Sequence, residues 1–241
     1  MTWNDLSVLA VVPARGGSKG VPRKNLREVG GLSLIGWAAK TIAELPWVDR
    51  AVLSTDDEEM AEEGRRRGLD VPSLHPAEFA TDMADSVGMW RHAWLEAEKH
   101  YNTRFDISIL LQPTTPLRRA EDVTRTVQAM VDGGHRAAAS VSAVPGHFTP
   151  HKCLTVDDNG VIGFFMDDGA QYANRQKIPD YYHRNGVCYA VTRETLIDHG
   201  HIVEEDCVAV AVDGFVVNID EPFELELAEF MLAREKSGTG K

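Results

Sequence analysis

The loop at residues 14–26 combines the residue types that bind phosphate groups. It contains three glycines and four cationic side chains, namely Gly16, Gly17, Gly20, Arg15, Lys19, Arg23 and Lys24. Glycines let the backbone come close to a ligand, and successive main-chain N–H groups in such a loop can cradle an anion. The chain has a formal net charge of −12, so this cationic loop opposes the overall charge. We therefore predict a polyphosphate site here.

An ordinary solvated basic loop is the alternative interpretation of the same residues. Their spacing matches neither the G-x-x-x-x-G-K-[ST] pattern of a P-loop nor the G-x-G-x-x-G pattern of a dinucleotide fold. The context favours the phosphate site, because an apolar run at residues 8–12 leads directly into the loop and is typical of a buried strand.

Strand and helix patterns alternate along most of the chain. Apolar runs predict strands at residues 8–12, 50–55, 71–74, 106–111, 137–144, 186–191, 207–212 and 215–219. Helical spacing predicts helices at residues 32–45, 58–67, 84–99, 120–131 and 222–234. Repeated βαβ units form a mostly parallel sheet with helices on both faces, so we predict an α/β fold.

Three polar segments directly follow predicted strands. They are the cationic loop, the pair Thr55-Asp56, and residues 112–114. Ligands of open α/β sheets bind beyond the carboxyl ends of the strands. We therefore expect these segments to meet in one crevice, although Thr55-Asp56 could simply cap the helix that begins near Glu58.

Residues 145–182 break the alternating pattern. A hairpin is expected across Asp158-Asn159-Gly160, because Asn-Gly favours tight turns. The pairs Phe164-Phe165 and Tyr181-Tyr182 are too apolar for free solvent. We predict a protruding arm at about residues 146–182 that packs on a second subunit and makes a homodimer; packing on its own domain is the alternative.

Composition excludes several classes of protein. A chain of 241 residues with this acidic balance is expected to form a single domain, 1–241, that binds neither nucleic acid nor a membrane surface. No apolar run approaches the roughly 18 residues of a membrane span, and the first residues lack the basic region of a secretory signal. Cys153, Cys188 and Cys207 form no metal or disulfide pattern, which favours reduced thiols and a cytoplasmic location.

Six motifs in order along nearly the whole chain resemble those of the CMP-sialic acid synthetases and of the related CMP-legionaminic and CMP-pseudaminic acid enzymes. The motifs are Ala14-Arg15-Gly16-Gly17-Ser18-Lys19-Gly20 with Lys24-Asn25-Leu26, Ser54-Thr55-Asp56, residues 76–82, residues 110–118, Asn185-Gly186, and Ile219-Asp220 before the last helix. This resemblance implies a nucleotidyltransferase of Rossmann-like fold. It also implies a reaction in which CTP and a nine-carbon 2-keto sugar acid give CMP-sugar and pyrophosphate with Mg²⁺ (or Mn²⁺).

The resemblance also implies roles for individual residues. The catalytic residues would be Arg15, Lys24 and Asp220; the nucleotide contacts Arg15, Gly17, Lys19, Lys24, Asn25 and Ser86; the sugar contacts Gln112, Lys152, Arg175 and Arg184; and the metal ligands Asp220 and Asn218. Chemistry of this kind depends on positioning and charge neutralisation rather than on a covalent nucleophile. Lys152 and Arg175 match arm positions that reach the sugar carboxylate bound by a neighbouring subunit.

Several of these residues have a plainer interpretation. Ser86 could cap a helix, Gln112 could satisfy loop backbone, and Asp220 could cap the last helix. Lys152 and Arg175 could be ordinary surface charges. His92, His100, His135, His199 and His201 show no ligand spacing and are expected to be structural or exposed.

Three positions depart from the family pattern. His75 and His183 stand where many sialic acid enzymes have Arg, and Asn218 stands where they have the first Asp of an Asp-x-Asp pair. These differences leave two alternatives open. One is a CMP-Kdo-type or other sugar nucleotidyltransferase, and the other is a weakly active paralogue that binds nucleotide and regulates or scaffolds surface-glycan synthesis.

Overall fold

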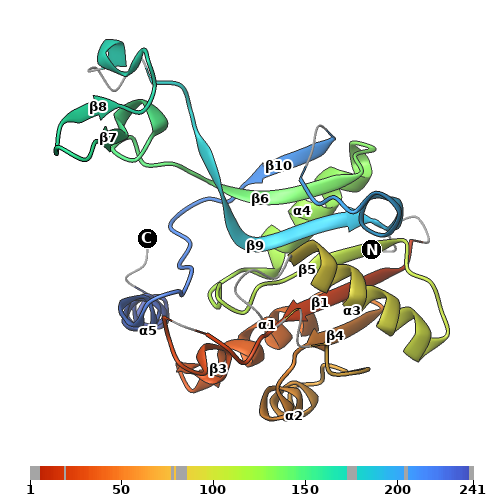
Figure 1. The fold of residues 1–241 in the computed structure, drawn as a ribbon. Helices are drawn as coiled ribbons and strands as arrows, with labels where there is room; N and C mark the ends of the chain where they lie inside the picture. The colour runs from red at the N-terminus through yellow and green to blue at the C-terminus, as the bar shows by residue number, and fades with distance from the viewer. Residues whose placement is uncertain are drawn as a thin grey trace.

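A six-stranded sheet forms the centre of the molecule in this computed structural model, which describes residues 6–18, 20–76, 79, 86–172, 178–203 and 206–238. The strand order is β10-β6-β9-β5-β1-β4 (Figure 1). Its strands are β1 (Val8–Pro13), β4 (Arg50–Ser54), β5 (Ile107–Leu110), β6 (Ala137–Ala143), β9 (Tyr182–Thr192) and β10 (Cys207–Ala211). β1 is parallel to β4 and β5, and β10 is parallel to β6. The predicted α/β fold with a mostly parallel sheet is confirmed.

β9 is antiparallel to both of its neighbours, β5 and β6. The first residue of β9, Tyr182, pairs with the last residue of β6, Ala143. The chain therefore leaves the sheet at the end of β6, passes through the arm, and returns beside β6 in the opposite direction. The arm is in effect the long loop of a β6–β9 hairpin, and this connection makes the sheet mixed.

Helices cover both faces of the sheet, as the alternation within β1 requires. Val8, Ala10 and Val12 pack in one cluster with side chains of α1, α2 and α4, whereas Leu9 and Val11 pack on the other face with α3. The helices are α1 (Leu34–Ala43), α2 (Glu58–Arg66), α3 (Ser86–Tyr101), α4 (Ala120–Asp132) and α5 (Pro222–Lys236). Both faces of the central strands are thus buried.

The beginning of α2 differs in detail from the prediction. Asp57, not Thr55 or Asp56, is its N-cap and accepts a hydrogen bond from the N–H of Met60 at 3.0 Å. Gly68, with φ of 85°, lies just after the helix end and has the left-handed conformation that such ends favour. Asp56 is therefore available to another partner, described below. The proposed caps of α3 at Asp82 and Asp85 lie outside the described residues.

Two predicted strands are wrong. Residues 71–74 form no strand; a single bridge joins Val52 to Asp70, and Pro72 has no N–H with which to continue a ladder. Residues 215–219 also lack strand pairing, and the apolar side chains of Val217 and Ile219 instead pack in a third cluster with α5 and the small β2–β3 hairpin (Glu28–Val29, Leu32–Ser33). The apolar pattern there reflects side-chain burial without a strand partner.

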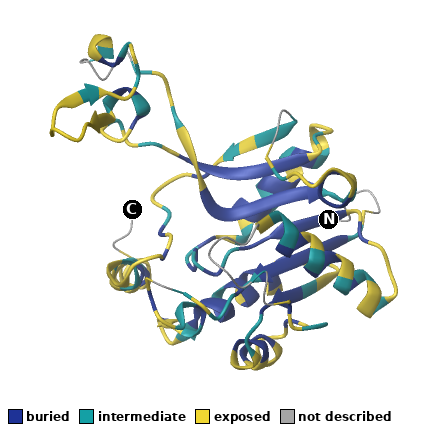
Figure 2. Ribbon diagram, in the orientation of Figure 1, coloured by how far each residue is buried: buried dark blue, intermediate teal, exposed yellow. Residues whose placement is uncertain are grey.

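The arm extends away from the sheet, and most of its residues are exposed (Figures 1 and 2). β7 (Leu154–Val156) and β8 (Ile162–Phe164) form the predicted hairpin, with Gly160 in its turn at φ of 79°. His151 is buried within the arm, where its ring packs on Tyr172 and its Nδ1 lies 3.0 Å from the hydroxyl of Tyr181. The arm therefore has a small polar-aromatic centre of its own.

Candidate functional site

A cavity of about 590 Å³ opens at the carboxyl ends of β1 and β5. The predicted site residues that line it are Arg15, Lys24, Asn25, Ser86, Gln112, Asn218 and Asp220. They come from four separate stretches of the chain, namely the cationic loop, the start of α3, the segment after β5 and the segment before α5. The predicted meeting of the cationic loop with the segment after β5 is confirmed.

The cationic loop is fixed at its beginning by the segment that follows β4. The N–H of Ala14 donates to the carbonyl oxygen of Ser54, and the N–H of Gly16 donates to Oδ1 of Asp56, at 2.9 and 2.8 Å. The buried Asn25 donates its side-chain amide to the carbonyl oxygen of Arg15 at 3.2 Å. These bonds hold the turn that places Arg15 in the cavity wall, and they give Asp56 a structural role.

Arg23 does not contribute to the phosphate-binding charge as predicted. Its guanidinium forms two hydrogen bonds with the Asp57 carboxylate, at 2.5 and 3.1 Å, and also pairs with Glu59. Although partial burial opposes it, these bonds hold the pKa of Asp57 below its usual value. Arg23 therefore ties the loop to the start of α2, and it is not among the cavity-lining residues.

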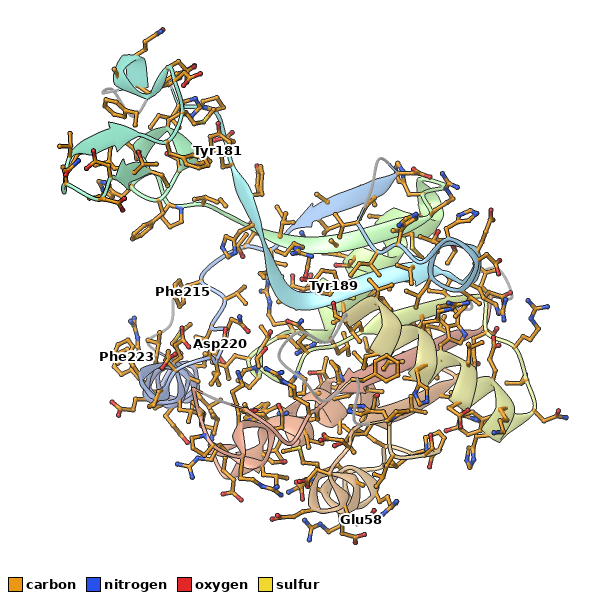
Figure 3. The ribbon with its side chains drawn as sticks, in the orientation of Figure 1. Glu58, Tyr181, Tyr189, Phe215, Asp220 and Phe223 are labelled. Carbon is orange, nitrogen blue, oxygen red and sulfur yellow. The ribbon has the colours of Figure 1, made fainter. Side chains whose placement is uncertain are left out.

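Lys24 and Asp220 form an ion pair inside the cavity. Nζ of Lys24 lies 2.8 Å from Oδ1 of Asp220; the lysine side chain is 13% exposed and the aspartate side chain 64%. Asp220, labelled in Figure 3, lies just before α5, and Asn218 donates its side-chain amide to Asp220 Oδ2 at 3.2 Å. Asp220 is not the helix cap, because α5 has its N-cap at Glu221.

Close backbone packing brings the cationic loop against the segment before α5. A Cβ on Gly20 would lie 2.2 Å from the carbonyl oxygen of Asp220. No side chain fits there without a shift of backbone, so glycine is required for this contact. The loop and the Asp220 segment are consequently two walls of one cavity, which explains how residues so far apart in sequence can form the Lys24–Asp220 pair.

His75, which was not predicted as a site residue, lines the cavity. Its Nδ1 lies 3.0 Å from the Ser54 hydroxyl, and its buried Nε2, which lies 3.7 Å from Asp56, has no hydrogen-bond partner among the described residues. Burial lowers the pKa of His75, and the nearby Asp56 charge partly opposes this. Its position beside the 76–82 motif was the available signal.

The remaining predicted residues lie elsewhere. Lys152 is in the arm, Arg184 is exposed on the part of β9 nearest the arm, and Gly17 is exposed on the cationic loop; none is among the residues that line the cavity. Lys19 and Arg175 lie outside the described residues. The structure of one chain therefore brings four of the six predicted nucleotide contacts into one cavity with Gln112, and the described arm residue, Lys152, lies elsewhere.

Asp220 and Asn218 have side chains of the oxygen-ligand type that Mg²⁺ takes. Mg²⁺ in proteins takes one or two carboxylates with several waters and substrate phosphates. Asp220 has a carboxylate that is 64% exposed, but its Oδ1 pairs with Lys24 and its Oδ2 accepts from the side-chain amide nitrogen of Asn218. A cation at Asp220 would therefore have to replace one of these contacts. Among the described residues there is no cluster of three or more His, Cys, Asp or Glu side chains that could hold a metal ion.

Comparison with known proteins points to one family. The cytidylyltransferase family model matches residues 9–201, most of the chain. A CMP-N,N'-diacetyllegionaminic acid synthase of Legionella pneumophila is 29% identical over 94% of this chain and 97% of its own length. A pseudaminic acid cytidylyltransferase of Campylobacter jejuni is 26% identical over 92% of this chain and 95% of its own.

A solved structure has the same fold. CMP:2-keto-3-deoxy-manno-octonic acid synthetase complexed with CTP matches 95% of this chain and 99% of its own, with a TM-score of 0.69 and 20% sequence identity. Among the described residues of the chain, no helix is both long and apolar enough to span a membrane. With the family model, the relatives and the shared fold in agreement, the chain belongs to the cytidylyltransferase family.

Proposed function

We propose that this protein transfers CMP from CTP to a nine-carbon 2-keto sugar acid in the cytoplasm. The observation that supports this most directly is the single cavity in which Arg15, Lys24, Gln112 and Asp220 meet at the carboxyl ends of the strands. Relatives of nearly equal length named for legionaminic and pseudaminic acids support this class of acceptor.

In the proposed reaction the anomeric hydroxyl of the sugar acid attacks the α-phosphate of CTP. The new bond joins the sugar oxygen to phosphorus, the bond to the β-phosphate oxygen breaks, pyrophosphate leaves with that electron pair, and the hydroxyl proton passes to solvent. Arg15 and Lys24 neutralise the negative charge that moves onto the leaving group. Lys19 and the backbone at Gly17 would complete the phosphate loop, while Asn25 and Ser86 would contact the nucleoside.

The metal expected with this reaction is Mg²⁺ or Mn²⁺, with Asp220 and Asn218 as its protein ligands. When bound it supplies positive charge to the triphosphate. The ion pair between Lys24 Nζ and Asp220 Oδ1, 2.8 Å apart, orients both side chains in the cavity. Because Asn218 is neutral, Asp220 provides the charge that this motif offers to the ion.

The sugar end of the site is proposed to be shared between two subunits. Gln112 and Arg184 would contact the acceptor from one subunit, while Lys152 and Arg175 of the arm would reach the sugar carboxylate of the other. Arginine suits a planar carboxylate because its guanidinium can form two parallel hydrogen bonds. The exposed apolar side chains on the arm support a partner surface there.

The decisive experiment is a pyrophosphate-release assay with a panel of substrates. Each of CTP, UTP, ATP and GTP is paired in turn with sialic, legionaminic, pseudaminic and eight-carbon Kdo-type acids. We expect strong preference for CTP and release only with a nine-carbon acid. Release with the Kdo-type acid alone would favour that enzyme instead, and CTP binding without release under any condition would favour the non-catalytic paralogue.

A further inference from the structure

Arg118 is a buried cation directly behind the cavity. It lies in the loop between β5 and α4 and is 8% exposed. Its Nε donates to the carbonyl oxygen of Thr115 at 3.1 Å, one terminal nitrogen donates to that of Val187 at 2.7 Å, and the other donates to that of Gln112. One guanidinium therefore joins the loop after β5 to strand β9.

Burial of this charge is costly, which makes its placement informative. Among the described residues, the hydrogen-bond acceptors of Arg118 are all backbone carbonyls, and none is a carboxylate. Burial lowers the pKa of Arg118 to about 10, so the group keeps its proton at neutral pH. A buried charge is destabilising unless it is hydrogen-bonded, and each of the three guanidinium nitrogens donates to a carbonyl oxygen here.

The backbone of Gly186 lies close to the Gln112 side chain. This glycine has φ of 74°, and a Cβ there would lie 2.6 Å from Gln112 Oε1 and 2.9 Å from Thr115 Oγ1. The neighbouring Asn185 is buried, with Oδ1 accepting from the Ser140 hydroxyl at 2.6 Å and the side-chain amide donating to Ser142. Gly186 is thus held in place by a polar network within the sheet.

Both sides of the Gln112–Gly186 contact are attached to the same guanidinium. Arg118 bonds the carbonyl of Gln112 on one side and the carbonyl of Val187, the residue after Gly186, on the other. Arg118 therefore joins the backbone that carries Gln112 to the backbone that follows Gly186. Lysine cannot reproduce the arrangement, because its ammonium has no planar set of fixed donors.

We propose that Arg118 is a positioning residue that sets the Gln112 side chain for the acceptor sugar acid. It touches neither substrate and acts through the loop that carries Gln112. This inference rests on the proposed function, since it assigns Gln112 to the acceptor. It predicts a selective effect on the acceptor half of the reaction, which a purely structural role would not produce.

The test is a double-mutant cycle with R118K and Q112A. For R118K we expect a fall of about tenfold to a hundredfold in kcat/KM for the sugar acid, as misplacement of a positioning group produces, with the Kd for CTP from calorimetry within about threefold of wild type. Q112A should be no further impaired when R118K is added, because groups that act as a unit are not additive. R119K is the matched control, since Arg119 is exposed and pairs with Asp122 on α4.

Several results would overturn the proposal. One is that the losses of kcat/KM caused by R118K and Q112A add up in the double mutant. Another is that R118K weakens CTP binding as much as it lowers kcat/KM for the sugar acid. A third is an R118K enzyme that is less stable but has unchanged kinetics. If R118K does not fold, G186A tests the same contact and should show the same selective loss. A wild-type enzyme without turnover would refute the proposed function instead, and a crystal structure of R118K with Gln112 unmoved would refute the positioning role independently of activity.

Discussion

The side chains of the cavity region and those of the arm have opposite surroundings. Around the cavity, partners come from distant parts of the same chain, as in the Lys24–Asp220 pair. On the arm, large apolar side chains meet solvent: Phe148 is 73% exposed and Phe165 is 65% exposed, with Val156 and Ile162 similar. The cavity region thus pairs its charged side chains within one chain, whereas the arm leaves large apolar side chains in solvent. The second subunit proposed above would cover that apolar surface.

The largest effect is expected at Asp220, because the proposed metal site has no other carboxylate from its motif. D220N should nearly abolish turnover, and N218D should lower the Mg²⁺ concentration needed for half-maximal rate. Rate measured against Mg²⁺ concentration checks both. If D220N keeps good turnover and needs the same Mg²⁺ concentration for half-maximal rate, Asp220 is not a metal ligand.

Substitutions of Trp90 and Phe165 compare how much a large side chain in each region contributes to the free energy of unfolding. Trp90 is fully buried and donates its indole N–H to the Ser108 hydroxyl at 2.8 Å. W90A should lower the free energy of unfolding by about 3–5 kcal/mol, whereas F165A should change it by no more than about 0.5 kcal/mol. The two variants are compared by urea denaturation at protein concentrations low enough to favour monomers. A large loss in F165A would mean that the arm stabilises its own chain.

Lys24 tests the chemistry of the cavity without disturbing the core. K24A should lower kcat/KM at least about a hundredfold, since a charge-assisted phosphate contact in a desolvated site contributes several kcal/mol. Circular dichroism should be unchanged because the residue lies in a loop. K99A is a suitable control, as Lys99 is 79% exposed on α3. Near-normal turnover in K24A would show that the loop does not hold the triphosphate.

A mixed dimer sharpens the comparison by asking whether the arm completes the partner's cavity. Lys152 variants and Lys24 variants should each be inactive as pure proteins. After subunit exchange, about a quarter of the sites should regain activity if each site takes its arm from the other subunit of a two-fold dimer. Sedimentation verifies the dimer. A fully active monomer would show instead that the arm is dispensable.

The smallest expected effect is the pH dependence contributed by His75. Burial lowers its folded-state pKa, so below its ordinary pKa of about 6.5 the unfolded chain binds more protons than the folded one. Its contribution to stability is therefore present above about pH 6.5 and is lost as the pH falls below it. Unfolding of wild type and H75Q from pH 7.5 to pH 5.5 measures it: the wild type should lose more stability. If the stability of wild type and of H75Q falls equally over this pH range, His75 does not contribute to the pH dependence.

The strands and helices that define the sheet could be predicted because both faces of it are covered. Continuous apolar runs such as that of β1 have few alternatives to a buried strand. Residues 215–219 have a similar apolar pattern and yet form no strand, because α5 and the β2–β3 hairpin bury Val217 and Ile219 without offering a ladder. The local apolar pattern indicates that a segment is buried, but only the tertiary arrangement decides whether a neighbouring strand or other side chains bury it.

The sequence predicted where some of the site residues would meet, but not their partners. The strand rule predicted that the segments carrying Arg15 and Gln112 would meet at one edge of the sheet, and both residues line the cavity. Asp220 also lines it, although it follows no strand. The sequence could not show that Arg23 pairs with Asp57 and Glu59, or that Arg118 bonds three carbonyls. A cationic side chain has many possible acceptors, and the choice depends on segments far apart in the sequence.

The position of β9 between β5 and β6 affects the order in which the sheet can form during synthesis. Ile107 of β5 pairs with Thr192 of β9, so β5 lacks its second neighbour until the chain has been synthesised past the arm. At about 5–20 residues per second this interval lasts several seconds. During it β5 presents an unpaired edge of buried-type side chains, the kind of edge that pairs with other chains. We therefore expect the yield of folded protein to fall when translation pauses within the arm.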